Sequence, residues 1–164
     1  MKPGKTAPRW TKDDWTALGL KALREHGPQG VTVEALCAAA GRTRGSFYHH
    51  FETMDAFLIA MAESWRAQGT DALIQKSLAE PDPNARRKQL NRMANALDHD
   101  LEVNIRLLAA QYPPVAKIVE ETDAARLFHS LHLAAQIRAP KGAGEFVKPA
   151  SAFLDGLLRG RTVS

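Results

Sequence analysis

The sequence predicts an all-α protein, and three observations support this. Apolar residues recur at three- and four-residue intervals through most of the chain, which is the period of a helix that buries one face. Nowhere do Val, Ile, Thr or aromatic residues alternate with polar ones at the two-residue period of a half-buried strand. Helix-starting and helix-stopping residues, such as Thr11, Gly41 and the Pro113-Pro114 pair, divide the chain into segments of helical length.

The first expected helix spans residues 12–26. Residues 1–9 precede it and combine Pro and Gly with basic side chains, so we expect them to form a flexible basic arm. Thr11 is a good N-cap, and the acidic residues that follow it suit the first turn of a helix. The helix is expected to stop at Gly27-Pro28, because Gly ends helices and Pro cannot continue one.

Two short helices are expected next, each with its own threonine cap. Thr32 precedes the first, over residues 33–40, and Gly41 closes it. Thr43 precedes the second, over residues 44–50. Two short helices joined by a turn of three or four residues that contains Gly have the spacing of a helix-turn-helix.

The second of these helices is polar on its outer face and anchored by aromatic residues. Phe47 and Phe51 lie four residues apart and are expected to point into the same core. Arginine can contact guanine through two hydrogen bonds, and hydroxyl groups contact phosphates, so this face suits DNA. Gly45 costs helix stability, which is easier to understand if the backbone must approach another surface. The alternative is a polar surface helix in an ordinary bundle. The side chains that could donate hydrogen bonds are Thr43, Arg44, Ser46, Tyr48 and His49.

The rest of the chain is expected to be helical as well. A long helix should run from residue 54 to about 79, with Gly69 as a kink or break. A further helix, capped by Asp82 or Asn84, should reach about Leu101. The next helical segment is expected at residues 102–111, and the Tyr112-Pro113-Pro114 break separates it from another at 115–138. After a loop at 139–144, a last helix is expected at 146–158. From 127 to 137 the apolar residues cover more than one face of the expected helix. A helix that packs on a single small core needs only one apolar face, so this segment is expected to have more than one packing partner.

Composition and charge limit the class of protein. The 164-residue chain is 45% hydrophobic, enough to bury a core, and no stretch approaches the roughly 18 to 20 apolar residues that a membrane span needs. Collagen-like, low-complexity and membrane-spanning proteins are excluded. The single cysteine, Cys37, has no partner for an internal disulfide, and no apolar signal core follows the charged start. We therefore expect a protein of the reducing cytoplasm.

The positive charge is concentrated in the first third of the chain. Residues 1–50 contain eight Lys and Arg against four Asp and Glu, whereas residues 51–164 contain 14 of each, so the whole net charge of +4 arises in the first segment. This distribution favours a polyanionic partner for that segment. A solvated basic tail is the alternative interpretation.

In this segment the sequence resembles the TetR family of bacterial transcriptional regulators. The family's pattern of Thr, a small-residue pair, Gly, a short turn, a basic residue with Gly, and then aromatic residues is matched in order by Thr32, Ala39 or Ala40, Gly41, Thr43, Arg44, Gly45, Phe47, Tyr48, His50 and Phe51. The resemblance implies that the region from Trp10 to Trp65 is a helix-turn-helix domain built on four helices. We accordingly expect a basic arm at 1–9, a DNA-binding domain at 10–53 and a regulatory and dimerisation domain at 54–164.

The resemblance also implies roles for individual residues. Thr32 and Tyr48 would contact phosphates, Arg42, Thr43, Arg44, Gly45, Ser46 and His49 would face the bases, and Phe47, Phe51 and Leu36 would form the core that orients them. The sequence departs from the family at Arg42, where a small apolar residue is common, and at Met54, where a phosphate-binding Lys is common. Arg42 is expected to add a contact to DNA. Basic residues of the arm, Lys2, Lys5 and Arg9, could replace the contact that Met54 cannot make.

Beyond this domain the chain resembles the family in organisation only. Such a region usually holds a small-molecule pocket and ends in two helices that pair with a second subunit, so residues 127–137 and 146–158 are the expected dimerising pair. The alternative is that both helices fold back in a monomer. The expected pocket residues are Trp65, Leu108, Tyr112, Phe128 and His132. A set that follows a pattern seen in some members comprises Glu102, Arg106, Pro113, Val115, Val119, Asp123 and Arg126.

The sequence therefore predicts a ligand-responsive repressor that binds a pseudo-palindromic operator as a homodimer, with a small-molecule inducer as a further partner. The main alternative is a helical interaction module that does not bind DNA. An enzyme or metal protein is disfavoured, although His129 and His132, and His99 with Asp100 and Glu102, have spacings that metal ligands use. We expect no catalytic residue, metal or cofactor, and Cys37 is interpreted as a small buried hydrophobe.

Overall fold

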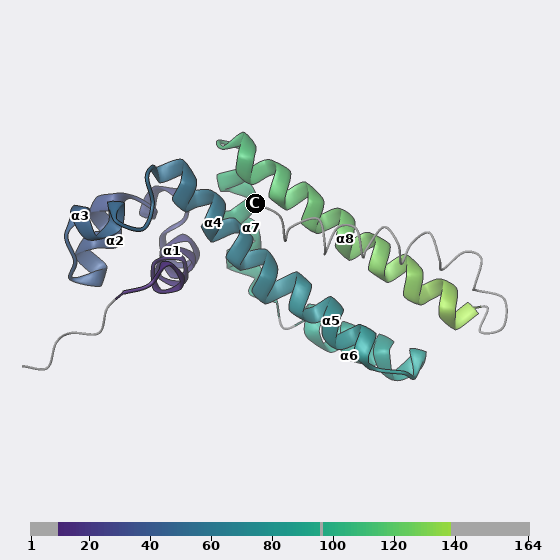
Figure 1. Cartoon of the computed structure of the whole chain (residues 1–164). Coiled ribbons are helices and arrows are strands. Elements are labelled where there is room, and N and C mark those ends of the chain that lie inside the picture. The colour runs from purple at the N-terminus through teal and green to yellow at the C-terminus, as the bar shows by residue number, and fades with distance from the viewer. Residues whose placement is uncertain (1–9, 96, 139–164) are drawn as a thin grey trace, which may run out of the picture.

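The computed structural model describes residues 10–95 and 97–138, and every regular element in them is helical. This confirms the predicted all-α class. The helices are α1 (Lys12–His26), α2 (Val33–Ala40), α3 (Arg44–Tyr48), α4 (Met54–Arg66), α5 (Ala72–Ala79), α6 (Pro83–Asn95), α7 (His99–Ala109) and α8 (Pro113–Arg138), with short helical turns at Pro28–Gly30 and Ala67–Asp71. Helices α2 and α3 lie at one end of the molecule, and α5, α6 and the end of α8 lie at the other (Figure 1).

The first two helices have the bounds that their caps predict. The Thr11 hydroxyl accepts from the Asp14 amide at 3.2 Å, and the Asp14 carboxylate accepts from the Thr11 amide at 2.8 Å, which makes a reciprocal capping box. The expected extent of α3 to residue 50 was wrong, because the helix ends at Tyr48. There the His50 amide bonds to the Phe47 carbonyl, three residues back, so the last turn tightens and turns the chain toward Phe51.

The long helix expected from residue 54 to 79 is present with the predicted interruption. Gly69 lies in a wide π-helical turn at Ala67–Asp71 between α4 and α5. The prediction that this next helix reaches Leu101 was wrong, because α6 ends at Asn95 and a separate helix, α7, begins at His99. Asp98 causes the new start, because its carboxylate accepts a hydrogen bond from the Leu101 amide at 3.1 Å and caps α7.

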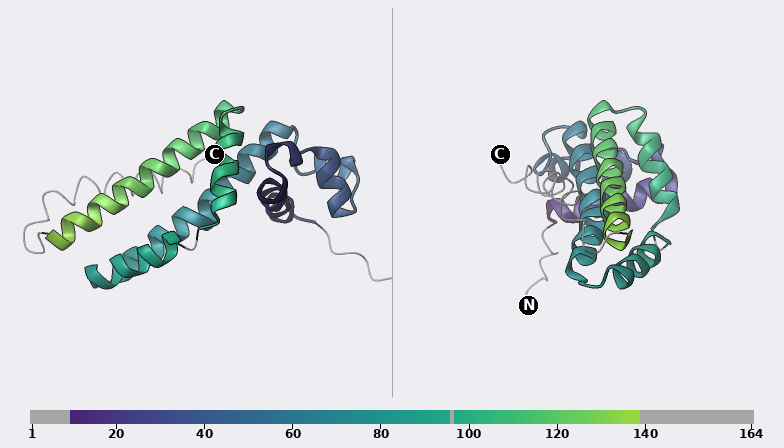
Figure 2. Two further views of the ribbon diagram at one scale, coloured as in Figure 1. Left: turned by 180° about the vertical axis from the view of Figure 1, so that it is seen from behind. Right: turned by 90° about the vertical axis from the view of Figure 1, so that its right-hand side faces the viewer.

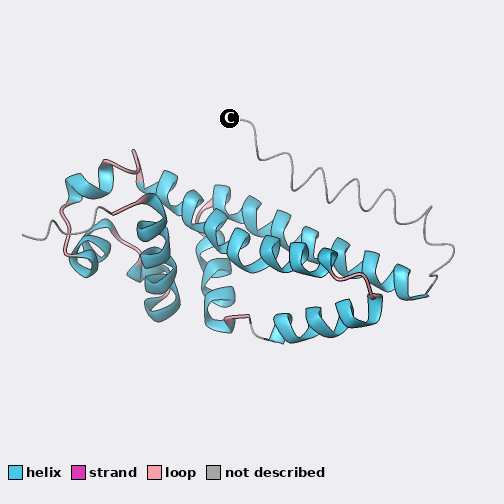
Figure 3. Cartoon of the chain, turned by 60° about the horizontal axis from the view of Figure 1, so that its bottom comes forward, coloured by secondary structure: helices cyan, strands magenta, loops and turns pink. Residues whose placement is uncertain are grey.

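Helix α8 begins at Pro113, two residues before the expected start, because prolines are tolerated in the first turn of a helix, and it forms one 26-residue helix. It packs along α4 and α7, and α1 also packs against both of these helices (Figures 2 and 3). The helices α1 and α4 approach closely at Gly19, where an added Cβ atom would lie 2.6 Å from the Phe57 ring. The expected loop at 139–144 and the expected helix at 146–158 lie outside the described residues.

One continuous hydrophobic core links the region of α2 and α3 to α7 and the first part of α8. It extends from Trp15 in α1 through Phe47, Phe57 and Met61 to Val119 in α8. Helix α4 belongs to this core along most of its length and therefore connects the region of α2 and α3 to the region of α7 and α8.

Candidate nucleic-acid interface

Helices α2 and α3 are joined by a tight turn whose geometry requires glycine. Gly41 has φ of 61°, in the left-handed region, and the amides of Gly41 and Arg42 bond to the Ala38 and Cys37 carbonyls at 3.2 and 3.0 Å. The turn thus closes α2 and redirects the chain at once into the Thr43 cap of α3. The Thr43 hydroxyl accepts from the Ser46 amide at 3.2 Å. This is the local geometry of a helix-turn-helix.

Aromatic rings fix the orientation of α3. The Phe47 ring is fully buried, with its centroid 5.3 Å from Trp15, 5.5 Å from Phe51 and 5.2 Å from Phe57. Most of these rings meet edge to face, the arrangement that aromatic quadrupoles favour. The prediction that Phe47 and Phe51 share a core is confirmed. Since the ring cluster includes side chains from α1, α3 and α4, it holds a five-residue helix that could not be stable alone.

The opposite face of α3 is exposed and polar. Thr43, Arg44, Gly45 and His49 are exposed, and the Tyr48 side chain is 46% exposed although its ring packs edge to face on Phe47 at 5.4 Å. Ser46 and Arg42 are half-buried, and Thr32 is exposed at the cap of α2. All the described residues expected to contact DNA therefore lie on or beside the helix-turn-helix, while Arg9 lies outside the described residues.

Two of these hydroxyl groups already accept backbone hydrogen bonds. The Thr32 hydroxyl accepts from the Ala35 amide at 3.2 Å, as the Thr43 hydroxyl does from Ser46. A hydroxyl that accepts in this way still has its own proton to donate. Thr32 and Thr43 can therefore cap their helices and donate to a phosphate oxygen in the same conformation.

Arg44 has an acidic neighbour that the sequence analysis missed. Its guanidinium lies 2.6 Å from the Glu34 carboxylate of α2, and both side chains are about two-thirds exposed. An exposed ion pair of this kind contributes about 0 to 1 kcal/mol, so little free energy is lost when the guanidinium turns to another acceptor. No spacing rule could have found the pair, because it depends on how α2 crosses α3.

Gly45 has open space above it. A Cβ atom built there would come no closer than 3.7 Å to the Thr43 hydroxyl, so the fold itself does not require glycine at this position. The residue is exposed on the polar face of α3. This agrees with the interpretation that the backbone here is kept bare for an external surface.

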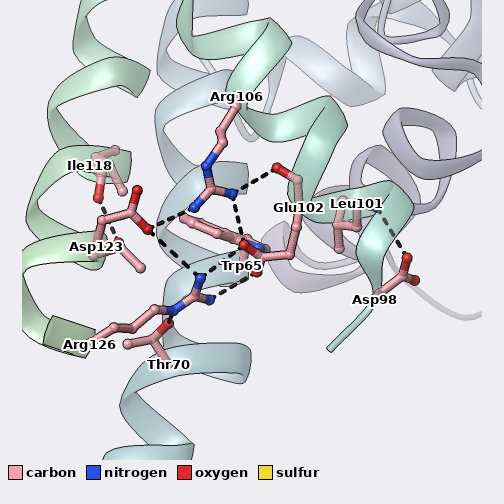
Figure 4. A network of polar contacts seen from close by, with 10 residues as sticks. Trp65, Thr70, Asp98, Leu101, Glu102, Arg106, Ile118, Asp123 and Arg126 are labelled. Carbon is pink, nitrogen blue, oxygen red and sulfur yellow. Dashed lines mark hydrogen bonds and ion pairs between the residues drawn. The ribbon is translucent and has the colours of Figure 1, made fainter. Parts of the chain in front are cut away.

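A second polar cluster joins α4, α7 and α8 and is drawn in Figure 4. Glu102 of α7 accepts two bonds from the Arg126 guanidinium at 2.9 Å each, one from Arg106 at 2.8 Å and one from the Trp65 indole at 3.2 Å. Arg106 also donates to Asp123 at 2.7 Å. Burial raises the pKa of the Glu102 carboxyl, but the hydrogen bonds and charges of Arg126 and Arg106 outweigh it and hold the pKa below its ordinary value.

A cavity of about 330 Å³ lies beside this cluster, where α1, α4, the π-helical turn and α7 meet. Of the expected pocket residues, Trp65 lines it. Leu108 is buried in the main core, Tyr112 packs partly buried against it, and His132 is buried on α8. Phe128 is exposed on α8. The other described residues that line this cavity are Leu20, Gln68, Gly69, Leu73, Leu97, Asp98, Leu101 and Glu102.

The expected apolar surface of α8 is present in its described part. Leu127 and Leu131 are 60% and 57% exposed, whereas Leu133 on another face is buried. Within the described residues, no group of three or more His, Cys, Asp or Glu side chains has the geometry of a metal site, and none of the helices is long and apolar enough to cross a membrane. Cys37 is buried, and this burial raises the pKa of its thiol.

Comparison with known proteins gives matches for the amino-terminal region. Residues 16–61 match the family described as bacterial regulatory proteins, tetR family. The HTH-type transcriptional repressor AcnR of Corynebacterium efficiens and that of Corynebacterium glutamicum are each 32% identical to this chain over 60 residues. AcnR of Corynebacterium diphtheriae is 30% identical over 60 residues. Each alignment covers 37% of this chain and 32% of the relative, so the chain matches about a third of the length of these relatives. No solved structure matches the chain.

Proposed function

We propose that the protein is a DNA-binding transcriptional regulator that acts as a ligand-responsive repressor in the cytoplasm, because residues 16–61 match the family of bacterial regulatory proteins described as tetR. A homodimer would place two copies of α3 in successive major grooves of a pseudo-palindromic operator, with half-site centres about 34 to 36 Å, or a multiple of that, apart. Occupancy of the operator would block transcription.

The observation that supports this proposal best is that α3 has one buried aromatic face and one exposed polar face. Its inner side is fixed by the ring of Phe47, and its outer side exposes Arg44, Gly45, Tyr48 and His49. Rigid placement of a few donors is what readout of base edges needs, since a bidentate contact depends on position and angle.

The proposal assigns different roles to the donors on this face. Arg44 leaves Glu34 and contacts a base edge in the major groove, with Arg42, Thr43, Gly45, Ser46 and His49 beside it. Thr32 and Tyr48 donate to phosphates and fix the register of the protein on the duplex. Arg9 adds a contact from the arm.

The proposed dimer would form through the last two helices. Leu127 and Leu131 support this, because their exposed apolar side chains need a partner surface of the same kind. The alternative, a helical interaction module that does not bind DNA, predicts that the exposed face of α3 has no affinity for duplexes.

The test is a selection from a random duplex library at near-physiological salt, combined with the mass of the protein in solution. The proposal predicts an inverted repeat bound by a dimer. Tyr48→Phe should weaken binding to all duplexes alike, whereas Glu63→Gln, an exposed change on α4, should alter nothing. Retention of no duplex, or of duplexes without a shared motif, would contradict the proposal and favour the interaction module.

A further inference from the structure

The helix-turn-helix contains one acidic residue, Glu34. It is the only Asp or Glu among residues 27–51, a stretch that otherwise exposes hydroxyl and cationic side chains. Val33 and Leu36 on the same helix are buried and hold α2 against the core, whereas the Glu34 side chain is about two-thirds exposed. An exposed ion pair such as the one it makes with Arg44 adds little stability. The stability of the fold therefore gives little reason for a carboxylate at this position.

This carboxylate lies beside the residue that is proposed to read bases. Its oxygen is 2.6 Å from the Arg44 guanidinium, which extends from the first residue of α3. The proposed function brings Arg44 to a base edge, so the Glu34 carboxylate comes to the same part of the major groove. Successive base pairs lie about 3.4 Å apart along the duplex. A group this close to Arg44 therefore meets the base pair that Arg44 contacts or the adjacent one.

The chemistry of a carboxylate limits the partner that Glu34 can find on DNA. An ionised carboxylate only accepts hydrogen bonds, as phosphate oxygens do, so the DNA backbone offers it no donor. The donors in the major groove are the amino groups of cytosine and adenine. Adenine has the N7 acceptor beside its amino group, which repels a carboxylate, whereas cytosine presents only the amino group there. Cytosine is therefore the better partner for Glu34.

We propose that Glu34 is a specificity-determining residue that accepts a hydrogen bond from the amino group of a cytosine, in the base pair that Arg44 contacts or in the adjacent one. In the free protein the two side chains pair with each other. On the operator Arg44 donates to guanine and Glu34 accepts from cytosine. A duplex without this cytosine leaves the carboxylate unpaired near phosphates and is disfavoured. This inference rests on the proposed DNA-binding function and adds a second base contact to it.

Repeating the duplex selection with two variants of the full-length protein tests this contact. Glu34→Ala removes the acceptor and should abolish the preference for cytosine at one position of each half-site, while the guanine that Arg44 contacts stays preferred. Glu34→Gln gives a sharper result, because an amide both donates and accepts and so matches the N6 and N7 atoms of adenine. The same position should therefore change from cytosine to adenine. Glu34→Gln preserves the size of the side chain and serves if Glu34→Ala does not fold.

A matched variant separates base readout from the simple loss of a negative charge. Glu52→Gln removes the same charge from an exposed position between α3 and α4. Both Gln variants should bind unrelated duplexes more tightly, because each has one fewer charge that repels phosphates. The ratio of the affinities for the selected and an unrelated duplex should fall at least about fivefold in Glu34→Gln and stay unchanged in Glu52→Gln. Fluorescence anisotropy with both duplexes measures this ratio.

Several outcomes would overturn the proposal. If Glu34→Ala changed the preference only at the guanine that Arg44→Ala also loses, Glu34 would position Arg44 without contacting a base. An affinity gain of equal size on all duplexes, as in Glu52→Gln, would reduce Glu34 to a repulsive charge. An unaltered motif in both Glu34 variants would refute this inference alone. Selection of no motif by the unaltered protein would refute the proposed function together with it.

Discussion

Two regions of the molecule share one apolar core but differ in the other interactions that hold them. The region of α1 to α3 with the first half of α4 is fixed by packed rings, of which Trp15, Phe47 and Phe57 are fully buried. The junction of α4, α7 and α8 adds to the apolar core a set of ion pairs centred on Glu102 and Arg126. Apolar packing depends little on pH or salt, whereas partly buried ion pairs depend on protonation. The exposed face of α3 therefore rests on packing that depends little on pH. The cavity lies beside the ion pairs, whose strength depends on protonation.

The largest expected effect tests the ring cluster. Phe47→Ala removes a fully buried ring from the centre of this cluster and should lower the free energy of unfolding by about 3 to 5 kcal/mol. DNA binding should be lost with it. Urea unfolding followed by circular dichroism measures the change. The neighbouring exposed ring supplies the control, since Tyr48→Phe should change stability by less than about 0.5 kcal/mol.

The next effect tests the ion-pair cluster. Glu102→Gln leaves Arg126, whose side chain is mostly buried, without its bidentate carboxylate, and should cost about 3 kcal/mol of stability. Glu63→Gln on the exposed face of α4 is the control. If Glu102→Gln proved as harmless as the control in the same urea titration, the junction would be held by apolar packing and the contrast between the two regions would fail.

The histidines of α8 give the junction side of the molecule a dependence on pH. Burial, together with the nearby charges of His132 and Arg86, lowers the pKa of His129 to about 4, and its Nε2 lies 2.9 Å from the Ser77 hydroxyl. The folded state therefore resists the proton that the unfolded chain takes up near pH 6.5. Stability should fall as pH decreases from about 6.5 to 4, by roughly 3 kcal/mol from this group.

Urea unfolding measured across this pH range in two variants separates the contribution of His129 to the pH dependence from that of other groups. His129→Gln should flatten the decline, whereas His99→Gln, an exposed change on α7, should preserve it. A decline of equal size in the His129 variant would show that the pH dependence arises elsewhere.

The smallest effect concerns a single phosphate contact. Tyr48→Phe should weaken DNA binding by about 1 kcal/mol, or roughly fivefold, with equal loss on selected and unrelated duplexes, because a phosphate contact contains no sequence information. Fluorescence anisotropy with both duplexes measures it. Loss confined to the selected duplex would place Tyr48 at a base edge instead.

Local signals explain why the amino-terminal helices were predictable. Thr11 and Gly27 bound α1, and Thr32 and Gly41 bound α2, with every signal lying within a turn of the helix end that it fixes. The end of α3 was missed because the tightening at His50 follows from burial of Phe51, which is a tertiary effect.

Long-range contacts explain what the sequence could not predict. Asp98 was expected in the last turn of a helix, because a solvated carboxylate and an N-cap look alike in a sequence. Its bond from the Leu101 amide shows that it caps α7 instead, and its bond from Arg24 ties this cap to α1. The grouping of Glu102, Arg106, Asp123 and Arg126 was visible as a pattern, yet their pairing depends on how α7 packs on α8. The lining of the cavity depends on helix packing in the same way, and of the expected pocket residues Trp65 lines it.

The central claim is that the exposed face of α3 reads DNA and the outer surface of the other end does not. The most direct measurement compares Arg44→Ala with Arg87→Ala, an exposed change on α6, for binding to the selected duplex and to a scrambled one. Arg44→Ala should lose about 1 to 3 kcal/mol on the selected duplex and much less on the scrambled one, and Arg87→Ala should bind both like the unaltered protein. An unchanged ratio of the two affinities in Arg44→Ala, or a larger loss in Arg87→Ala, would contradict the account.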